Sequence, residues 1–388
     1  MGTVRDVVVI GAGPAGLHVA YRLAAAGLDI VLLEAQARIG ERAICSGVIG
    51  EEAFARFALP TRPVLTNIHC IEAISPGGRK LQHGTDTPLA RVVNKGELNR
   101  ALGERALATG VEIRLGRCVQ SFEREREGVV ARFCSAERGS EMLKARVAII
   151  ASGVNCSLNR DFGLARPREF LRAIQADVTL PNGNKSAPTR VYVGRCIAPG
   201  AFGWEIPLGN GHARVGLMST RDPKPYFRAL LSRIAPTVEA SQLNICQKGI
   251  AQAPVGRCAA DRILTVGEAA GHVKTSTGGG IYYGLLSAEF AAEVVLRAFQ
   301  KREFTTHAFS DFERYWRTTF GKELLVGYLV RKLASYLRDS QIERIFEAAK
   351  ASNLLVRLDG RLKFDWHHEA LLATLRSLLA LPGGLGDG

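Results

Sequence analysis

Long hydrophobic runs are missing from this sequence, since no stretch approaches the ~18 consecutive apolar residues that a membrane-spanning helix needs. The first apolar segment begins at Val7, with no basic-then-apolar leader before it, so we expect no secretion signal. The eight cysteines form no C-x-x-C pair and no cluster with histidine at metal-ligand spacing. We therefore expect free thiols, no bound metal and a cytoplasmic protein.

Basic tails, internal repeats and low-complexity linkers are missing as well. The formal net charge is +14, from 51 Lys and Arg against 37 Asp and Glu, and the excess is spread evenly along the chain. This distribution argues against a nucleic-acid partner. An evenly basic surface would attract anionic substrates or an anionic membrane leaflet, and an inert basic surface is the alternative.

Residues 6–34 read as a strand, a glycine turn, a helix and a second buried strand. Gly11 permits the tight turn, Gly13 lets the backbone approach a pyrophosphate, and Gly16 lets helix and strand pack closely. Glu34 ends the second strand, where its carboxylate can accept hydrogen bonds from ribose hydroxyls. The free N–H groups at the helix start suit phosphates. This pattern predicts dinucleotide binding, and a merely tight strand–helix corner is the alternative.

A second glycine-rich region, residues 264–284, favours FAD as the dinucleotide. A strand ends in Gly267-Glu268, and a helix starts near Gly280-Ile281 after a glycine-rich turn. The acid can bind a ribityl or ribose hydroxyl. The helix start would stabilise the negative charge that a reduced flavin develops.

The remaining pattern indicates an α/β protein with an inserted antiparallel sheet and a helical C-terminal region. We expect a helix at 97–109 and strands at 111–120, 128–134 and 145–151, then short alternating strands at 190–193 and 213–218. Helices follow from residue 301.

Two stretches resemble motifs of the geranylgeranyl reductase family of flavoproteins. Residues 199–207 are similar to that family's P-x-x-Y-x-W-x-F-P motif, with Phe202 in place of Tyr and Ile206 in place of Phe. Residues 267–281 are similar to the motif that closes over FAD, with Glu268 where Asp is commoner. The resemblance covers residues 5 to about 300, with a weaker helical tail.

The resemblance implies the fold of para-hydroxybenzoate hydroxylase and reduction of isolated C=C bonds in prenyl lipids, diphosphates or quinone side chains. An FAD-binding Rossmann-like domain would comprise residues 1–60, 88–167 and 251–300, a catalytic antiparallel sheet domain residues 61–87 and 168–250, and a helical region residues 301–388. Beside the glycines of the first turn, the residues implied to line FAD are Ala15, Glu34, Cys45, Ser46, Val48, Arg100, Val119, Glu268, Gly280 and Ile281.

Three residues are candidates for catalysis. By resemblance Cys45 lies next to the flavin ring, where its thiol could donate a proton, contact the ring or simply pack. Phe202 and Trp204 would form an aromatic wall for the prenyl chain, or else belong to the core of the sheet domain.

The electron donor and the rival functions stay open at this point. The sequence has no second glycine–acid module for a nicotinamide, so NADPH would visit the same face of the flavin, or reduced ferredoxin would serve. A monooxygenase or halogenase of the same fold is one rival, disfavoured by the tryptophan motif. A non-catalytic electron-transfer or lipid-binding flavoprotein is the other.

The segment 322–338 groups leucines and tyrosines at helical spacing, with cations between them. Such a helix packs on a domain core or lies on an anionic membrane surface. The second interpretation would make the protein peripheral at the membrane.

Overall fold

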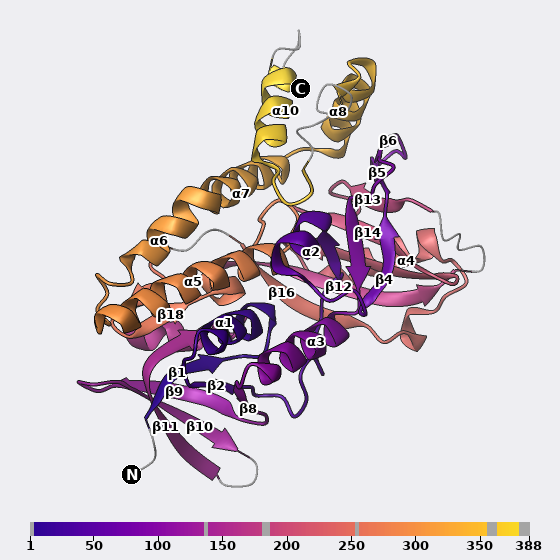
Figure 1. Ribbon diagram of the computed structural model, residues 1–388. Helices are drawn as coiled ribbons and strands as arrows, with labels where there is room; N and C mark the ends of the chain where they lie inside the picture. Colours follow the sequence, from indigo (N-terminus) through magenta and orange to yellow (C-terminus); the bar gives the residue numbers. More distant parts are fainter. Residues whose placement is uncertain (1–3, 136–138, 181–186, 253–255, 355–362, 380–388) are drawn as a thin grey trace.

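The computed structural model describes residues 4–135, 139–180, 187–252, 256–354 and 363–379. Figure 1 shows a lower part built on the N-terminal strands, a second sheet above and beside it, and helices that run from the lower part to the C-terminal end. The described strands form three sheets, of eight, seven and three strands. The two large sheets are the ones that position the site.

The eight-stranded sheet has the order β17-β18-β11-β1-β2-β8, and β10 and β9 continue from β11. β18, β11, β1, β2 and β8 run parallel, while β17, β10 and β9 pair antiparallel. The strands are β1 Arg5–Ile10, β2 Ile30–Leu33, β8 Glu112–Arg114, β9 Cys118–Arg124, β10 Val129–Ser135, β11 Gly139–Ile150, β17 Ala259–Ala260 and β18 Ile263–Thr265.

Both faces of the parallel sheet are buried, as expected for βαβ units. Val7 and Val9 of β1 face a core with helices α1 (Pro14–Ala25), α3 (Lys95–Ala108) and α5 (Ile281–Lys301). Val8 and Ile10 face the opposite side, where Phe122 of β9 packs. The uninterrupted apolar run of β1 follows from this two-sided burial.

The seven-stranded sheet has the order β16-β12-β15-β14-β13-β5-β6 and is antiparallel except between β13 and β5. Its strands are β5 Cys70–Ile74, β6 Lys80–Gly84, β12 Glu169–Thr179, β13 Thr189–Val193, β14 Phe202–Gly209, β15 His212–Ser219 and β16 Cys246–Gln252. The small sheet contains β3 Val48–Gly50, β7 Ala90–Val93 and β4 Val64–Ile68.

The two faces of the seven-stranded sheet have different partners. One face carries Ile174, Val215 and Leu217 and packs against helix α4 (Pro223–Ile234). The other face carries Trp204 and Met218, packed with residues of the small sheet. We call this second side the Trp204 face.

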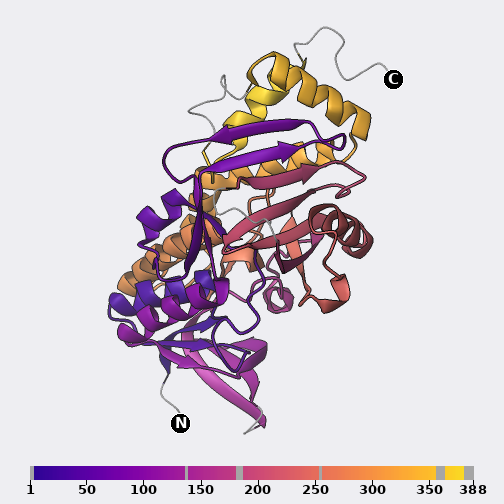
Figure 2. The same ribbon diagram turned by 90° about the vertical axis from the view of Figure 1, so that its right-hand side faces the viewer.

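The C-terminal helices connect the two parts of the molecule. α6 (Ser310–Trp316) packs along α5, and α7 (Lys322–Ala334) continues from it through a π-helical turn at Arg317–Gly321 (Figures 1 and 2). α8 (Asp339–Ala351) and α10 (His368–Leu379) lie at the far end, and α2 (Glu51–Phe57) follows β3. The short 3₁₀ helices are η1 Ser157–Phe162, η2 Ala240–Gln242 and η3 Gly267–Ala270. Among the described residues, no helix is both long and apolar enough to span a membrane.

The strand expected at 111–120 is two strands in the structure. Gly116 has a positive φ of 64° and breaks the segment between β8 and β9. β8 joins the parallel sheet beside β2, whereas β9 pairs with β10 on its other side. A single apolar pattern could not reveal that the chain changes partners here.

Candidate functional site

The first glycine turn lies between the end of β1 and the start of α1. Gly11 has a φ of 103°, and a Cβ there would lie 2.6 Å from the carbonyl oxygen of Ala151. A Cβ on Gly16 would collide with the carbonyl oxygen of Gly11. Gly13, in contrast, has no described atom within 4 Å of its Cβ position, and its side of the turn faces open space. The turn therefore packs tightly against the sheet and is open only where Gly13 faces outward.

The start of helix α1 suits an anionic group. Gly13 is its N-cap residue, and no described side chain caps its first N–H groups. Exposed N–H groups and the positive end of the helix dipole bind phosphates. The open space at Gly13 therefore fits the pyrophosphate of FAD.

Glu34, directly after β2, is held in place by the glycine turn and by the residues that follow it. Its carboxylate accepts hydrogen bonds from the backbone N–H of Ala12 at 2.6 Å and of Gln36 at 2.9 Å. A carboxylate has about four lone-pair sites, so further sites stay available for ribose hydroxyls. The residues present thus fit both the phosphates and the sugar of a dinucleotide.

The second glycine region packs directly on the first. Gly267 has a φ of 65°, and a Cβ there would lie 3.0 Å from the Cβ of Ala15 in helix α1. The N–H of Gly267 donates to the hydroxyl of Ser287 in α5 at 3.0 Å. α5 begins at Ile281 behind Gly280, which provides no side-chain cap. The N-termini of α1 and α5 therefore lie together. We call the two glycine regions, with these two helix starts, the cofactor cradle.

Glu268 is ion-paired across the two large sheets. Its Oε2 lies 2.6 Å from Nζ of Lys248 on strand β16, and it is 3.9 Å from the Cβ position of Gly153 at the end of the parallel sheet. Sequence reasoning did not identify Lys248, because nothing local in β16 marks it. The glutamate side chain is long enough to reach this lysine while its strand end stays in the cradle.

Cys45 and Ser46 are fixed to the seven-stranded sheet through their carbonyl groups. The Cys45 carbonyl accepts from Nε2 of Gln175 at 3.0 Å, and the Ser46 carbonyl accepts from Nη1 of Arg214 at 2.8 Å. The backbone N–H of Gly47 donates to the Cys45 sulfur at 3.4 Å. Arg214 in turn pairs with Asp177. The backbone of Cys45 and Ser46 is therefore held against the seven-stranded sheet.

Trp204 lies on β14 directly over Gly216 of β15. A Cβ on Gly216 would lie 2.6 Å from the indole ring, so only glycine leaves room for it. The ring of Phe202 contacts Trp204 edge-on, with 6.1 Å between centroids. Met218 neighbours both, and its sulfur is 2.9 Å from the Cβ position of Gly278 in the second glycine region. The Trp204 face thus meets the loop that precedes α5.

Three other residues are implied to line FAD. Arg100 is exposed on α3 and pairs with Glu97 at 3.3 Å. Val119 of β9 packs on the core below the parallel sheet, and Val48 starts β3 at the margin of the Trp204 face. Contact of these three residues with FAD stays a prediction.

The second glycine region is also tied to the C-terminal segment. Lys274 is buried, and its ammonium lies 3.6 Å from Oδ1 of Asp365 and 4.8 Å from the centre of the Phe364 ring. Burial lowers the pKa of Lys274 and raises the pKa of Asp365. Glu323 of α7 accepts from the backbone N–H groups of His367 and His368. These contacts fix the helical region against the cradle.

Lys95, at the start of α3, is a functional candidate that the sequence did not reveal. Its ammonium donates to the side-chain oxygen of Asn99, and it interacts electrostatically with Cys45, Lys248 and Glu268. Loss of solvation at this position lowers the pKa of Lys95 to about 8. A lysine that titrates near neutrality at the cradle can adjust its charge to the redox state of a bound flavin.

We predict that Lys95 shapes the pH dependence of the reduction potential of bound FAD. Below pH 8 the lysine is protonated in both redox states. Between pH 8 and the higher pKa that the lysine has beside a reduced, more negative flavin, it takes up a proton on reduction, which steepens the fall of potential by about 30 mV per pH unit for that proton in a two-electron reduction. Lys95→Met should remove the steepening, which equilibrium titration against redox dyes would measure. Identical slopes above pH 8 in both proteins would show that Lys95 is not coupled to the flavin.

Comparison with known proteins agrees with this geometry. Residues 5–155 match the pyridine nucleotide-disulphide oxidoreductase family. Digeranylgeranylglycerophospholipid reductase 2 of Methanothermobacter thermautotrophicus is 29% identical over 392 residues, covering 96% of this chain and 99% of that protein. The resemblance to geranylgeranyl reductases is confirmed.

Solved structures support the fold of the geranylgeranyl reductases. A geranylgeranyl bacteriochlorophyll reductase-like protein from Thermoplasma acidophilum matches with a TM-score of 0.83 and 17% identity, covering 97% of this chain and 96% of that chain. The p-nitrophenol 4-monooxygenase of Pseudomonas putida matches with a TM-score of 0.72 and 18% identity, covering 97% and 99%. The predicted FAD-binding α/β fold with a helical C-terminal region is therefore confirmed, and FAD is the cofactor that the site fits.

Proposed function

We propose that this protein is an FAD-dependent oxidoreductase that reduces isolated C=C bonds in the prenyl chain of a lipid, a diphosphate or a quinone. The observation that carries the proposal is the contact of the Trp204 face with the second glycine region, through Met218 and Gly278. This contact puts an apolar surface beside the cradle that fits FAD. Relatives named as digeranylgeranylglycerophospholipid reductases support the same substrate class.

The protein's own residues would orient the chain and supply a proton. The hydride would come from bound FAD after its reduction by NADPH or reduced ferredoxin. An isolated alkene has no carbonyl to stabilise charge, so alignment and exclusion of water must lower the barrier. Phe202 and Trp204 would align the prenyl chain, and the thiol of Cys45 would give its proton to the second carbon. Gln175 and Arg214 hold the carbonyl groups of Cys45 and Ser46 against the seven-stranded sheet.

The test of the aromatic wall is Trp204→Ala. FAD should stay bound, because neither glycine region depends on Trp204. The rate at which a prenyl diphosphate reoxidises the reduced enzyme should fall by about 100-fold, the cost of misplacing reacting atoms by roughly an ångström. Trp204→Phe keeps an aromatic ring over Gly216, so its reoxidation rate should fall far less. Wild-type rates for both variants in stopped-flow absorbance would show that the ring is only core.

Helix α7 supports the further proposal that the protein docks on an anionic membrane surface. The leucines that the sequence assigned either to a core or to a membrane surface are exposed, with Leu325 at 48%, Leu329 at 50% and Leu333 at 61%, and Tyr336 just beyond the helix is 71% exposed. The buried side of α7 carries Glu323, Leu324, Gly327 and Arg331. An exposed apolar stripe on a helix with flanking cations is typical of binding at a lipid interface.

Binding to vesicles tests the docking surface. Binding to vesicles of anionic lipid should fall steeply as salt rises past physiological strength. A double change, Leu329→Ser with Leu333→Ser, should weaken binding at least tenfold, because each buried leucine contributes about 1.5–3 kcal/mol. Leu107→Ser, on α3 and 53% exposed, is the matched control and should bind like the wild type. Equal binding of wild type and double variant in co-sedimentation would exclude α7 as the contact.

A further inference from the structure

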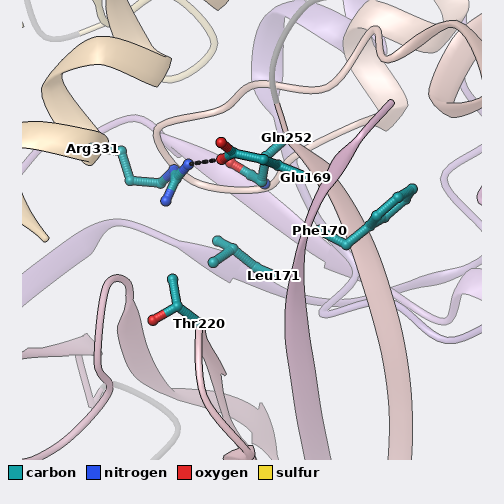
Figure 3. Close-up of a pocket in the computed structure, with 6 residues that line it drawn as sticks. All are labelled: Glu169, Phe170, Leu171, Thr220, Gln252 and Arg331. Atoms are coloured by element: carbon teal, nitrogen blue, oxygen red, sulfur yellow. Dashed lines mark ion pairs between the residues drawn. The ribbon is translucent and has the colours of Figure 1, made fainter. Parts of the chain in front are cut away.

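A small pocket lies between the end of the seven-stranded sheet and helix α7. It has a volume of about 250 Å³ and is lined by Glu169, Phe170, Leu171, Thr220, Gln252 and Arg331. Figure 3 shows Arg331 reaching across to Glu169, with Gln252 beside them, while the Phe170 ring points away. The pocket therefore has a polar end and an apolar wall.

Buried polar atoms without partners distinguish this pocket. Gln252 is 1% exposed, and neither its amide nitrogen nor its amide oxygen has a hydrogen-bond partner among the described residues. Nε of Arg331 is likewise buried and unpartnered within the described ranges. Leaving such groups unpaired costs about 1–3 kcal/mol each. The arrangement is consistent with a polar ligand that completes these hydrogen bonds.

The local charge favours an anionic ligand. Arg331 and Lys332 both approach Glu169, at 3.6 Å and 3.1 Å, so two cations face one carboxylate. The hydroxyl of Tyr328 also donates to Glu169, at 2.9 Å. Glu169 lines the pocket with its charge offset by these partners, while Nε of Arg331 and the amide of Gln252 keep unused hydrogen-bonding capacity for an oxyanion.

The pocket lies on the same side of the sheet as the cradle. Gln252 and Lys248 are four residues apart on β16, so they share a face roughly 13 Å from one another. Leu171 and Ile250 lie between them on the Trp204 face, and Met218 lies level with Lys248 on the neighbouring strands. Lys248 in turn pairs with Glu268 at the cradle. An apolar path therefore joins the polar pocket to the site of reduction.

We infer that this pocket holds the phosphate-type end group of the prenyl substrate, bound by Gln252 and Arg331 while the chain lies along the Trp204 face. The inference rests on the proposed function and narrows its substrate class to prenyl chains that carry a phosphate or phosphate ester. Gln252 would donate to one phosphate oxygen and accept from a hydroxyl or protonated oxygen. Arg331 supplies the charge.

Calorimetric binding to the oxidised holoenzyme tests the assignment, with geranylgeranyl diphosphate and geranylgeraniol as probes. Gln252→Met and Arg331→Met should each weaken binding of the diphosphate at least tenfold and leave binding of the alcohol within twofold. Lys301→Met removes the same charge at the exposed end of α5, outside the pocket, and should change neither. Gln252→Met should also keep or raise the melting temperature, because it removes an unpaired buried amide.

Several outcomes would overturn the inference. The variants could weaken binding of the diphosphate and binding of the alcohol equally. Gln252→Met could also leave binding of both probes unchanged, as expected if water fills the pocket. Inorganic pyrophosphate could bind as tightly as the prenyl diphosphate in a Gln252-dependent way, which would make this a free phosphate site. Competition by a digeranylgeranylglyceryl phosphate would instead identify a lipid as the source of the phosphate.

Reoxidation of the reduced enzyme separates this inference from the proposed function. If neither prenyl probe reoxidises the flavin but the diphosphate still binds through Gln252, the reductase proposal fails and the pocket assignment stands. If both probes reoxidise the flavin and the variants do not alter the ratio of the two reoxidation rates, the reductase proposal stands and the pocket assignment fails.

Discussion

Gly13→Val is expected to abolish FAD binding and leave the protein folded. The Cβ position of Gly13 meets no described protein atom within 4 Å, so the larger side chain fits the apo-protein. The same space is where the pyrophosphate would approach the N-terminus of α1. The purified variant should be colourless and should not take up added FAD, whereas wild-type protein should release FAD on denaturation. Absorbance of the bound flavin measures the difference.

Gly16→Ala is the matched control for this prediction. A Cβ there collides with the carbonyl oxygen of Gly11, so the backbone itself must shift. We expect a lower melting temperature of the apo-protein for Gly16→Ala, and an unchanged one for Gly13→Val. Retention of yellow colour by Gly13→Val would contradict the placement of the pyrophosphate at this turn.

Cys45→Ser is expected to slow prenyl reduction severely without loss of substrate binding. Thiols have pKa values near ~8.5 in model peptides, far below those of alcohols, so serine is a much weaker proton donor. The hydrogen bonds of Gln175 and Arg214 go to carbonyl groups and should survive the change. In a single turnover, the dithionite-reduced variant should bind a prenyl diphosphate with the wild-type affinity and reoxidise slowly.

A second variant distinguishes proton transfer from packing. If the thiol donates the proton, Cys45→Ala has no proton to give and should reoxidise as slowly as Cys45→Ser. Wild-type rates in both variants would assign the proton to water or to another residue.

Local sequence signals predicted the cofactor cradle because each of them has a local physical cause. A turn that needs a positive φ at Gly11, and a close approach at Gly16, admit only glycine. Glu34 follows its strand directly, and its hydrogen bonds go to residues next to the motif. The uninterrupted apolar run of β1 likewise reflects burial on both faces.

The polar partners of the site could not be predicted in the same way. Lys248 pairs with Glu268, and Gln175 holds Cys45, only because two sheets that are distant in sequence meet at the cradle. Gly216 is conspicuous in the structure because Trp204 covers it, but it is an ordinary strand glycine in the sequence. The exposed leucines of α7 have a helical spacing that fits core and membrane equally well, so only the structure shows which side is covered.

The most direct test is a single turnover of the dithionite-reduced wild-type enzyme with a prenyl diphosphate, first without oxygen and then with it. Without oxygen, the flavin should reoxidise at a rate that depends on the prenyl substrate, and mass spectrometry should find a product that has gained two hydrogen atoms per reduced bond. Reoxidation only in the presence of oxygen, with a product that has gained an oxygen atom, would contradict the reductase and indicate a monooxygenase of the same fold.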